Sequence, residues 1–208
     1  CIDEKSGIQA IERPQANKLM RPNSLEKFEH EYIRHGTQTL IASMEVITGK
    51  VCGHLGDTRG SMDFISFIKK RIATDPEAKW IFIVDNLNTH KSVDLVIWLA
   101  NEIGFKGDLG KYTPNSNKSF GILKSQETRS RFLSDNAHRI RFVYTPKHCS
   151  WMNQIEIWFS ILSKKLLRRL HCNSIDMLKD RVINFIDYFN ESLAKPFKWT
   201  YEGKPLQI

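Results

Sequence analysis

The stretch Trp80-Ile81-Phe82-Ile83-Val84-Asp85-Asn86 decides the fold. Its first five residues are all apolar and are rich in β-branched and aromatic side chains, which is typical of a strand that helices cover on both faces. Asp85 and Asn86 end the run, and Ser92 is placed to cap a helix that reaches about Ile103. A strand followed by a helix in this way indicates a layered α/β domain.

Patterns on either side of this stretch add further strands and helices. Thr48-Gly49 is a turn between two strand-like runs, so residues 39–46 and 50–55 are expected to pair as an antiparallel hairpin. Another strand is expected at residues 140–144, and helices at about 62–72 (capped by Ser61), 124–133, 151–170 and 174–190 (capped by Ser174). The predicted fold class is α/β, with a mixed central sheet (the antiparallel hairpin plus parallel strands) flanked by helices.

Both ends of the sequence carry shorter apolar patterns. Ile2-Asp3 is interpreted as the end of a strand, and Ile8 and Ala10 as a second short strand after a turn at Ser6-Gly7. The segment 196–199 is expected to pack back on the body of the protein. Residues 1–208 are expected to form a single domain.

The composition is that of a folded protein with an anionic partner. Apolar residues make up 41% and charged residues 26%, which excludes disordered and low-complexity classes. Thirty-one lysines and arginines stand against 23 acids, and the net charge of +8 makes nucleic acid the first candidate partner, although a merely basic surface is an alternative. No apolar run has the length of a membrane span, and no signal peptide is expected. With its four cysteines expected to be reduced, the chain is predicted to be cytoplasmic.

Residues 104–139 differ in character from their surroundings and are expected to form a basic insertion. Glycine, proline and asparagine interrupt regular structure there, and basic residues far outnumber acids. Lys118 and Lys124 are therefore candidate DNA contacts.

Three acids stand where a metal-dependent reaction needs them. Asp3 follows the first strand fragment, and Asp85 follows the apolar strand, at the end where ligand sites of open α/β sheets gather. Glu156 lies early in the predicted helix 151–170, one turn after Asn153 and on the same polar face. Carboxylates that converge without thiolate or imidazole partners suit Mg²⁺ or Mn²⁺, and two such ions can activate a water and stabilise the leaving oxygen of a phosphodiester.

Each acid also has a plainer interpretation. An aspartate at the end of a strand is often a helix cap or a turn residue, and Glu156 is a type of residue favoured near any helix N-terminus. The pattern of three acids is therefore more informative than any one of them.

Several short sequence motifs are distributed over nearly the whole length of the chain. They are Cys1-Ile2-Asp3-Glu4-Lys5-Ser6-Gly7-Ile8-Gln9-Ala10, Arg34-His35-Gly36-Thr37, Val84-Asp85-Asn86-Leu87-Asn88-Thr89-His90-Lys91, Tyr144-Thr145-Pro146, Ser150-Trp151-Met152-Asn153-Gln154-Ile155-Glu156 and Lys195-Pro196-Phe197-Lys198-Trp199. Together they resemble the mariner-type transposases of bacterial insertion sequences, a DDE superfamily of endonucleases.

This resemblance implies an RNase H-like fold and a catalytic, metal-binding triad of Asp3, Asp85 and Glu156. It implies cut-and-paste DNA transposition with two Mg²⁺ or Mn²⁺ ions, cleavage at terminal inverted repeats and joining to target DNA, usually at TA. Paired-end cutting implies a homodimer or a larger assembly on DNA. The helix-turn-helix region that normally precedes this catalytic domain is absent from the chain, and the 104–139 insertion is longer than the family leads us to expect.

Further residues are expected to support the triad or to hold DNA. Asn86, His90 and Asn153 are placed to steady the acids, although His90 could equally make a helix-entry hydrogen bond and Asn86 could be a turn residue. Glu4 is left out of the triad because it alternates away from Asp3. The expected DNA contacts, besides those of the insertion, are Arg34, His35, Lys164, Lys165, Arg168 and Arg169.

Two other functions remain open at this point. One is a non-catalytic DNA-binding or assembly module derived from a transposase. The other is an RNase H-type nuclease that has no strand-transfer step.

Overall fold

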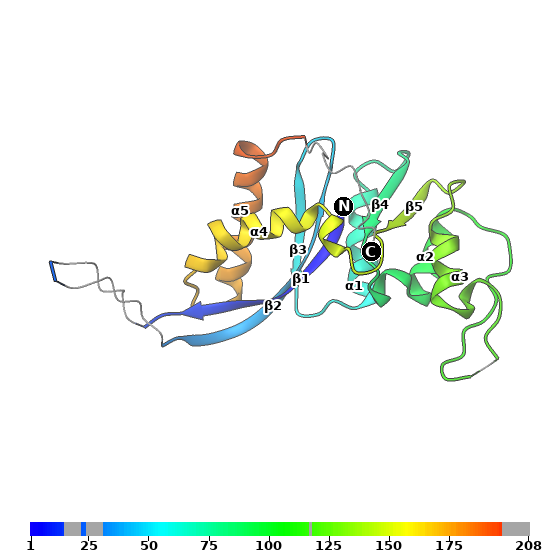
Figure 1. Ribbon diagram of the computed structural model, residues 1–208, viewed down its shortest axis with the longest axis horizontal. Coiled ribbons are helices and arrows are strands. Elements are labelled where there is room, and N and C mark those ends of the chain that lie inside the picture. Colours follow the sequence, from blue (N-terminus) through cyan, green and yellow to red (C-terminus); the bar gives the residue numbers. More distant parts are fainter. Residues whose placement is uncertain (15–21, 24–30, 117, 197–208) are drawn as a thin grey trace, which may run out of the picture.

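The computed structural model describes residues 1–14, 22–23, 31–116 and 118–196 (Figure 1). The strands are β1 (Ile2–Glu12), β2 (Ile33–Met44), β3 (Val51–Gly56), β4 (Trp80–Val84) and β5 (Ile140–Tyr144). The helices are α1 (Ser61–Ile72), α2 (Val93–Glu102), α3 (Gln126–Leu133), α4 (Ile155–Lys165) and α5 (Ile175–Ser192). Short 3-10 turns are η1 (Asn88–Lys91), η2 (Ile122–Lys124), η3 (Ser150–Met152) and η4 (Leu167–Arg169).

The strands form an antiparallel sheet in the order β1-β2-β3 and a parallel pair, β4-β5. This combination confirms the predicted α/β class and is compatible with an RNase H-like fold. The end of β4 lies near the start of β1, and Ile2 packs in the same core cluster as Phe82 and Val84. Within the described residues no hydrogen-bond ladder joins β1 to β4, so side chains hold the two sheets together.

β1 is one bulged strand, where the sequence predicted two pieces and a turn. Lys5 is paired with Leu40 and Ile8 with Gln38, so β1 carries one more residue than β2 across this interval. Gly7 absorbs the extra residue with φ 75°, a conformation that costs glycine little. The bulge switches which residues of β1 face α4: Asp3 and Lys5 before it, Ile8 and Ala10 after it.

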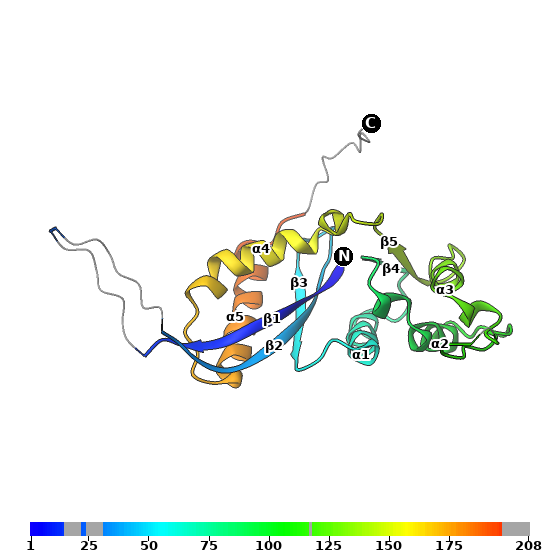
Figure 2. The ribbon, with the colours of Figure 1, turned by 60° about the horizontal axis from the view of Figure 1, so that its bottom comes forward.

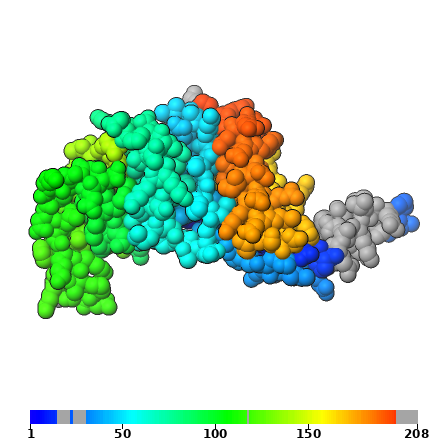
Figure 3. All heavy atoms as spheres, turned by 180° about the vertical axis from the view of Figure 1, so that it is seen from behind, coloured from blue at the N-terminus to red at the C-terminus, as the bar shows by residue number. Residues whose placement is uncertain are grey.

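Helices cover both sheets and create two hydrophobic cores (Figures 1 and 2). α4 and α5 pack on the antiparallel sheet, where Trp158 and Leu162 are buried with Leu40. α1, α2 and α3 pack against the parallel pair, where Phe64 and Phe142 are fully buried. Ile81 of β4 is 51% exposed, so the prediction that helices cover this strand on both faces is wrong. Figure 3 shows, from behind, α5 on one side of β3 and α1 with the insertion on the other.

The predicted helix over 151–170 is wrong as a single element, because β1 holds the chain at both ends of α4. Before α4, the Asn153 amide donates a 2.9 Å hydrogen bond to the Ile2 carbonyl and fixes the end of η3. After α4, the chain turns through η4 and the Cys172 N–H donates to the Ile11 carbonyl at 2.8 Å. These tertiary contacts override the helical periodicity of the sequence.

Two of the three predicted serine caps are confirmed. The Ser92 and Ser174 hydroxyls each accept a backbone N–H in the first turn of α2 and α5. Ser61 is instead the first residue of α1, with Gly60 at the cap position, and its hydroxyl donates to Asp94 of α2 at 2.8 Å.

The insertion contains the predicted short helix as α3, together with a bridge between Lys111 and Phe120. The predicted packing of the tail falls on residues 197–199, which lie outside the described residues. None of the helices in the described part of the chain has the length and apolarity that crossing a bilayer requires.

Candidate active site

The three predicted acids come from three elements that approach one another. Asp3 lies on β1, Asp85 directly follows β4, and Glu156 lies in the first turn of α4. Burial raises the pKa of Asp3, and the hydrogen bond from the Glu4 N–H lowers it. Together with the negative charges of Asp85, Glu4 and Glu156, which also raise it, the result is a pKa of about 7. The structure therefore brings Asp85 and Glu156 each within electrostatic range of Asp3.

Asp3 is held firmly in place, with only 6% of its surface exposed. One carboxylate oxygen accepts the Glu4 N–H at 2.7 Å, and the other lies 3.5 Å from the Asn153 amide nitrogen. Because the same Asn153 amide also donates to the Ile2 carbonyl, it connects the start of α4 to the Asp3 position. The sequence led us to expect Asn153 to steady Glu156, and its side chain instead contacts Asp3 and the Ile2 carbonyl.

Asp85 is oriented by groups that follow it in the chain. Its Oδ1 accepts the Leu87 N–H at 2.9 Å and lies 2.9 Å from Nδ1 of His90. Although burial raises the pKa of Asp85, the bonds from His90 and Leu87 outweigh it and lower the pKa below its ordinary value. Asp85 therefore carries its negative charge at neutral pH.

His90 lies between two carboxylates and is fully buried against the ring of Phe64. While Nδ1 faces Asp85, Nε2 lies 3.1 Å from Oε1 of Glu4, whose side chain is 1% exposed. Burial alone would lower the pKa of His90, but the hydrogen bonds to Asp85 and Glu4 raise it to about 9. The imidazolium form can donate to both acids at once.

Sequence reasoning missed Glu4 and Lys91. Alternation along β1 does turn Glu4 away from Asp3, but the face that it reaches is the one where His90 lies. Lys91 donates to the Asn86 side chain and lies 4.6 Å over the ring of Tyr144. Because Lys91 directly follows the candidate residue His90 in the sequence, its place near the site could have been predicted.

Asn86 was predicted to steady the acids, but its contacts run to the next strand. Its amide donates to the Thr145 carbonyl, and its oxygen accepts from Lys91. Asn86 therefore ties the end of β4 to the end of β5.

The donor set suits a hard cation. Asp3, Asp85 and Glu156 offer only carboxylate oxygens, the ligands that Mg²⁺ and Mn²⁺ prefer. A cation would also offset the mutual repulsion that helps to raise the pKa of Asp3. Among the described residues, no three His, Cys, Asp or Glu side chains are close enough together to form a metal-binding group. The acids are thus gathered, but they do not share one ligation point.

The predicted DNA contacts are all exposed, but they are spread over the molecule. Lys164 and Lys165 end α4, and Arg168 and Arg169 follow on η4. The others lie on the outer part of β2 (Arg34 and His35) and on the insertion (Lys118 and Lys124), at opposite ends of the molecule (Figure 1).

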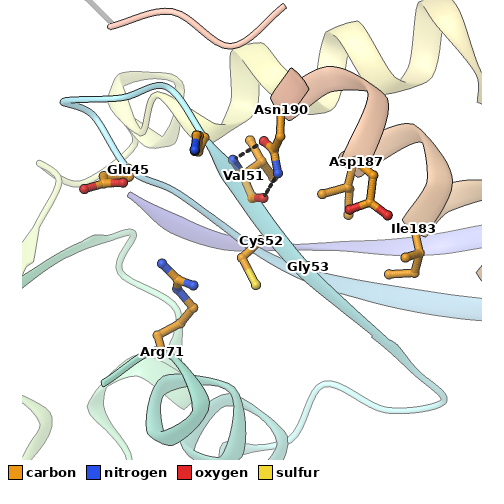
Figure 4. A pocket seen from close by; sticks show the side chains of 10 residues that line it. Glu45, Val51, Cys52, Gly53, Arg71, Ile183, Asp187 and Asn190 are labelled. Atoms are coloured by element: carbon orange, nitrogen blue, oxygen red, sulfur yellow. Dashed lines mark hydrogen bonds between the residues drawn. The ribbon is translucent and has the colours of Figure 1, made fainter. Parts of the chain in front are cut away.

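A hollow between β3, α1 and α5 is a different place from the acid site (Figure 4). Cys52, Arg71 and Asp187 line it, and the Asn190 amide bonds both backbone groups of Val51 at 2.7 Å. Asn190 thereby extends the edge of β3, and none of the predicted site residues lines the hollow.

The fold and the acids define an α/β protein with a carboxylate site at the junction of its sheets. The sequence model of the DDE superfamily endonucleases matches residues 1–179, and the chain belongs to this family. The chain is also 25% identical over 187 residues to the insertion element IS630 uncharacterized 39 kDa protein of Shigella sonnei. That match covers 89% of this chain and 41% of the relative, so the chain spans about two-fifths of the relative's length. No solved structure matches the chain.

Proposed function

We propose that this chain is the catalytic domain of a transposase that cuts DNA at the ends of an insertion element and joins those ends to target DNA. The observation that carries the proposal is the electrostatic coupling of Asp3 to both Asp85 and Glu156, which come from separate elements. Membership of the DDE superfamily endonucleases and the similarity to an insertion-element protein support the same function.

In this proposal Asp3, Asp85 and Glu156 are the catalytic and metal-holding residues. Two bound Mg²⁺ or Mn²⁺ ions supply an activated water or sugar hydroxyl and charge stabilisation at the leaving oxygen. The chain holds Asp85 through His90 and Leu87, and it holds the Asp3 region through Asn153. The fixed acids thereby limit the rearrangement that the reaction needs.

The exposed cations hold the DNA backbone in this proposal. Lys164 and Lys165 lie on the same helix as Glu156, so phosphates along the exposed end of α4 would lead toward the acids. Two ends must be cut for one transposition event, so we expect a homodimer or a larger assembly on DNA, acting in the bacterial cytoplasm at the nucleoid.

Substitution of one acid tests the catalytic role. Asp85→Asn keeps the size of the side chain but removes its charge, so we expect cleavage of terminal-repeat DNA in Mg²⁺ to fall by about 10³-fold or more. DNA binding measured in Ca²⁺ is expected to persist. Asp187→Asn, an exposed change on α5, is the matched control and is expected to cut normally.

Unchanged cutting by Asp85→Asn would remove Asp85 from the mechanism. The products of the unsubstituted chain decide the joining step, because a transposase yields strand-transfer products and a hydrolytic nuclease yields only cleaved ends. DNA binding without any metal-dependent cleavage would identify a binding module instead.

A further inference from the structure

The two aspartates of the candidate site lie on different sheets. Asp3 belongs to the antiparallel sheet and Asp85 follows the parallel pair, and in the described residues no backbone ladder connects β1 with β4. Hydrogen bonds between strands therefore do not fix the distance between these two carboxylates. Side chains that bridge the sheets must do so.

His90 is such a bridge. Its Nε2 meets Glu4, the neighbour of Asp3 on β1, at 3.1 Å, and its Nδ1 meets Asp85 at 2.9 Å. The imidazole has no exposed surface, and the ring of Phe64 packs against it with centroids 4.4 Å apart. The bridge is therefore a fixed part of the interior rather than a surface ion pair.

The bridge also selects which oxygen of Asp85 is available. Oδ1 receives both the Leu87 N–H and the His90 ring nitrogen. Among the described residues Oδ2 makes no hydrogen bond, so it is the oxygen that remains for a ligand. Rotation of the carboxylate would break both bonds to Oδ1, and it is therefore opposed.

We propose that Glu4 is a positioning residue of the metal site, which acts through His90 to fix the orientation of Asp85 and its spacing from Asp3. This inference rests on the proposed function. Groups behind metal-ligating side chains orient them and tune their affinity, and losing such a group typically weakens metal binding or activity by 10–100-fold. Glu4 stands in that position, although it does not face the acids directly.

The burial of Glu4 supports a role beyond general stability. Its side chain is 1% exposed, and Oε2 is buried without a hydrogen-bond partner in the described part of the chain. A buried charged pair generally contributes less to stability than a well-packed apolar pair of the same size. A role in orienting His90 and Asp85 therefore explains the buried Glu4 carboxylate better than a contribution to folding stability does.

The test measures binding of Mn²⁺ alone to the DNA-free chain by titration calorimetry. Glu4→Gln keeps the shape of the side chain and removes its charge, and we expect about tenfold weaker Mn²⁺ binding. The cleavage rate at saturating DNA is expected to fall similarly, with DNA affinity in Ca²⁺ unchanged. Glu12→Gln, on the same strand and also paired with a histidine, is the matched control and is expected to bind Mn²⁺ normally.

A double substitution separates positioning from an independent effect. If Glu4 acts through His90, adding Glu4→Gln to His90→Gln causes little further loss of Mn²⁺ affinity. Losses that add, or an equal loss in Glu12→Gln, would overturn the inference. Should circular dichroism show that Glu4→Gln does not fold, Glu4→Asp replaces it, and unchanged affinity in whichever variant folds also overturns the inference.

The outcomes for the two proposals are distinct. The proposed function fails if the unsubstituted chain neither binds Mn²⁺ nor cuts DNA. It also fails if Asp85→Asn binds Mn²⁺ and cuts DNA as well as the unsubstituted chain does. If Asp85→Asn loses binding and cutting while Glu4→Gln keeps both, the function stands and the role given to Glu4 is wrong.

Discussion

Strand β1 contributes a glutamate to two carboxylate–imidazole pairs, one buried and one exposed, and the buried histidine also bonds Asp85. Glu4 meets His90 at 3.1 Å, and Glu12 meets His35 at 2.7 Å. The side chains of the first pair are 1% and 0% exposed, and those of the second are 33% and 28% exposed. The shorter contact is therefore the one that water reaches.

The comparison teaches that burial, rather than distance, decides what such a pair does. Water screens the Glu12–His35 pair, and exposed pairs of this kind contribute about 1 kcal/mol or less. The Glu4–His90 pair has no water to replace a lost partner, so removing one member leaves a charge buried. The Glu12–His35 pair can therefore be replaced with little loss of stability, whereas the Glu4–His90 pair fixes the junction of the two sheets.

The largest predicted effect is on stability. His90→Ala leaves Glu4 buried and unpaired, and we expect the free energy of unfolding to fall by about 3–5 kcal/mol. Glu12→Ala removes the exposed pair and is expected to lower it by about 1 kcal/mol or less. Urea unfolding followed by circular dichroism measures both, and similar losses in the two variants would contradict the comparison.

The buried pair also predicts how stability depends on pH in EDTA. Burial would lower the pKa of His90, but its two carboxylate partners raise it to about 9, against an ordinary value of 6.5. The folded chain then holds a proton that the unfolded chain releases, so this stabilisation is complete below about pH 6.5 and is lost as pH rises through about 9. At about 1.4 kcal/mol for each pKa unit, the loss is about 3 kcal/mol by about pH 10.

Urea unfolding across this pH range measures the slope. His90→Gln is expected to remove it, and Glu12→Gln is expected to retain it. A slope that survives in His90→Gln would assign the titration to another group and break the contrast between the two pairs.

Local pattern was sufficient to predict the elements that carry the acids. The apolar run that ends at Val84 placed Asp85 at the end of a strand, and the spacing around Glu156 placed it early in a helix. Both predictions depend on short-range periodicity, which the tertiary structure retains here. The predicted triad itself stays a prediction, because its test is the metal-dependent reaction.

Long-range contacts defeated the same reasoning elsewhere. Alternation placed Glu4 on the correct face of β1, but it could not reveal that His90, far along the chain, covers that face. Periodicity likewise joined η3, α4 and η4 into one helix, since bonds from Asn153 and Cys172 to β1 are invisible in sequence. The bulge at Gly7 was interpreted as a turn because glycine permits either.

The smallest predicted effect extends the comparison to cations. On α3, Arg131 pairs with Glu127 at 2.5 Å, and both side chains are more than 70% exposed. Arg129, two residues earlier, is buried and donates to the carbonyls of Lys91 and Leu123, which joins the insertion to η1. Arg129→Met leaves both carbonyls without these donors, and we expect a loss of about 2 kcal/mol in the free energy of unfolding.

Arg131→Met is the matched control on the same helix, and we expect no measurable loss because its pair is exposed. Arg129 holds the backbone of the turn that carries His90, so Arg129→Met is also expected to weaken Mn²⁺ binding slightly. Equal stability losses in Arg129→Met and Arg131→Met would show that exposure does not rank these contacts. The different stability contributions expected of the Glu4–His90 and Glu12–His35 pairs could then not be attributed to burial.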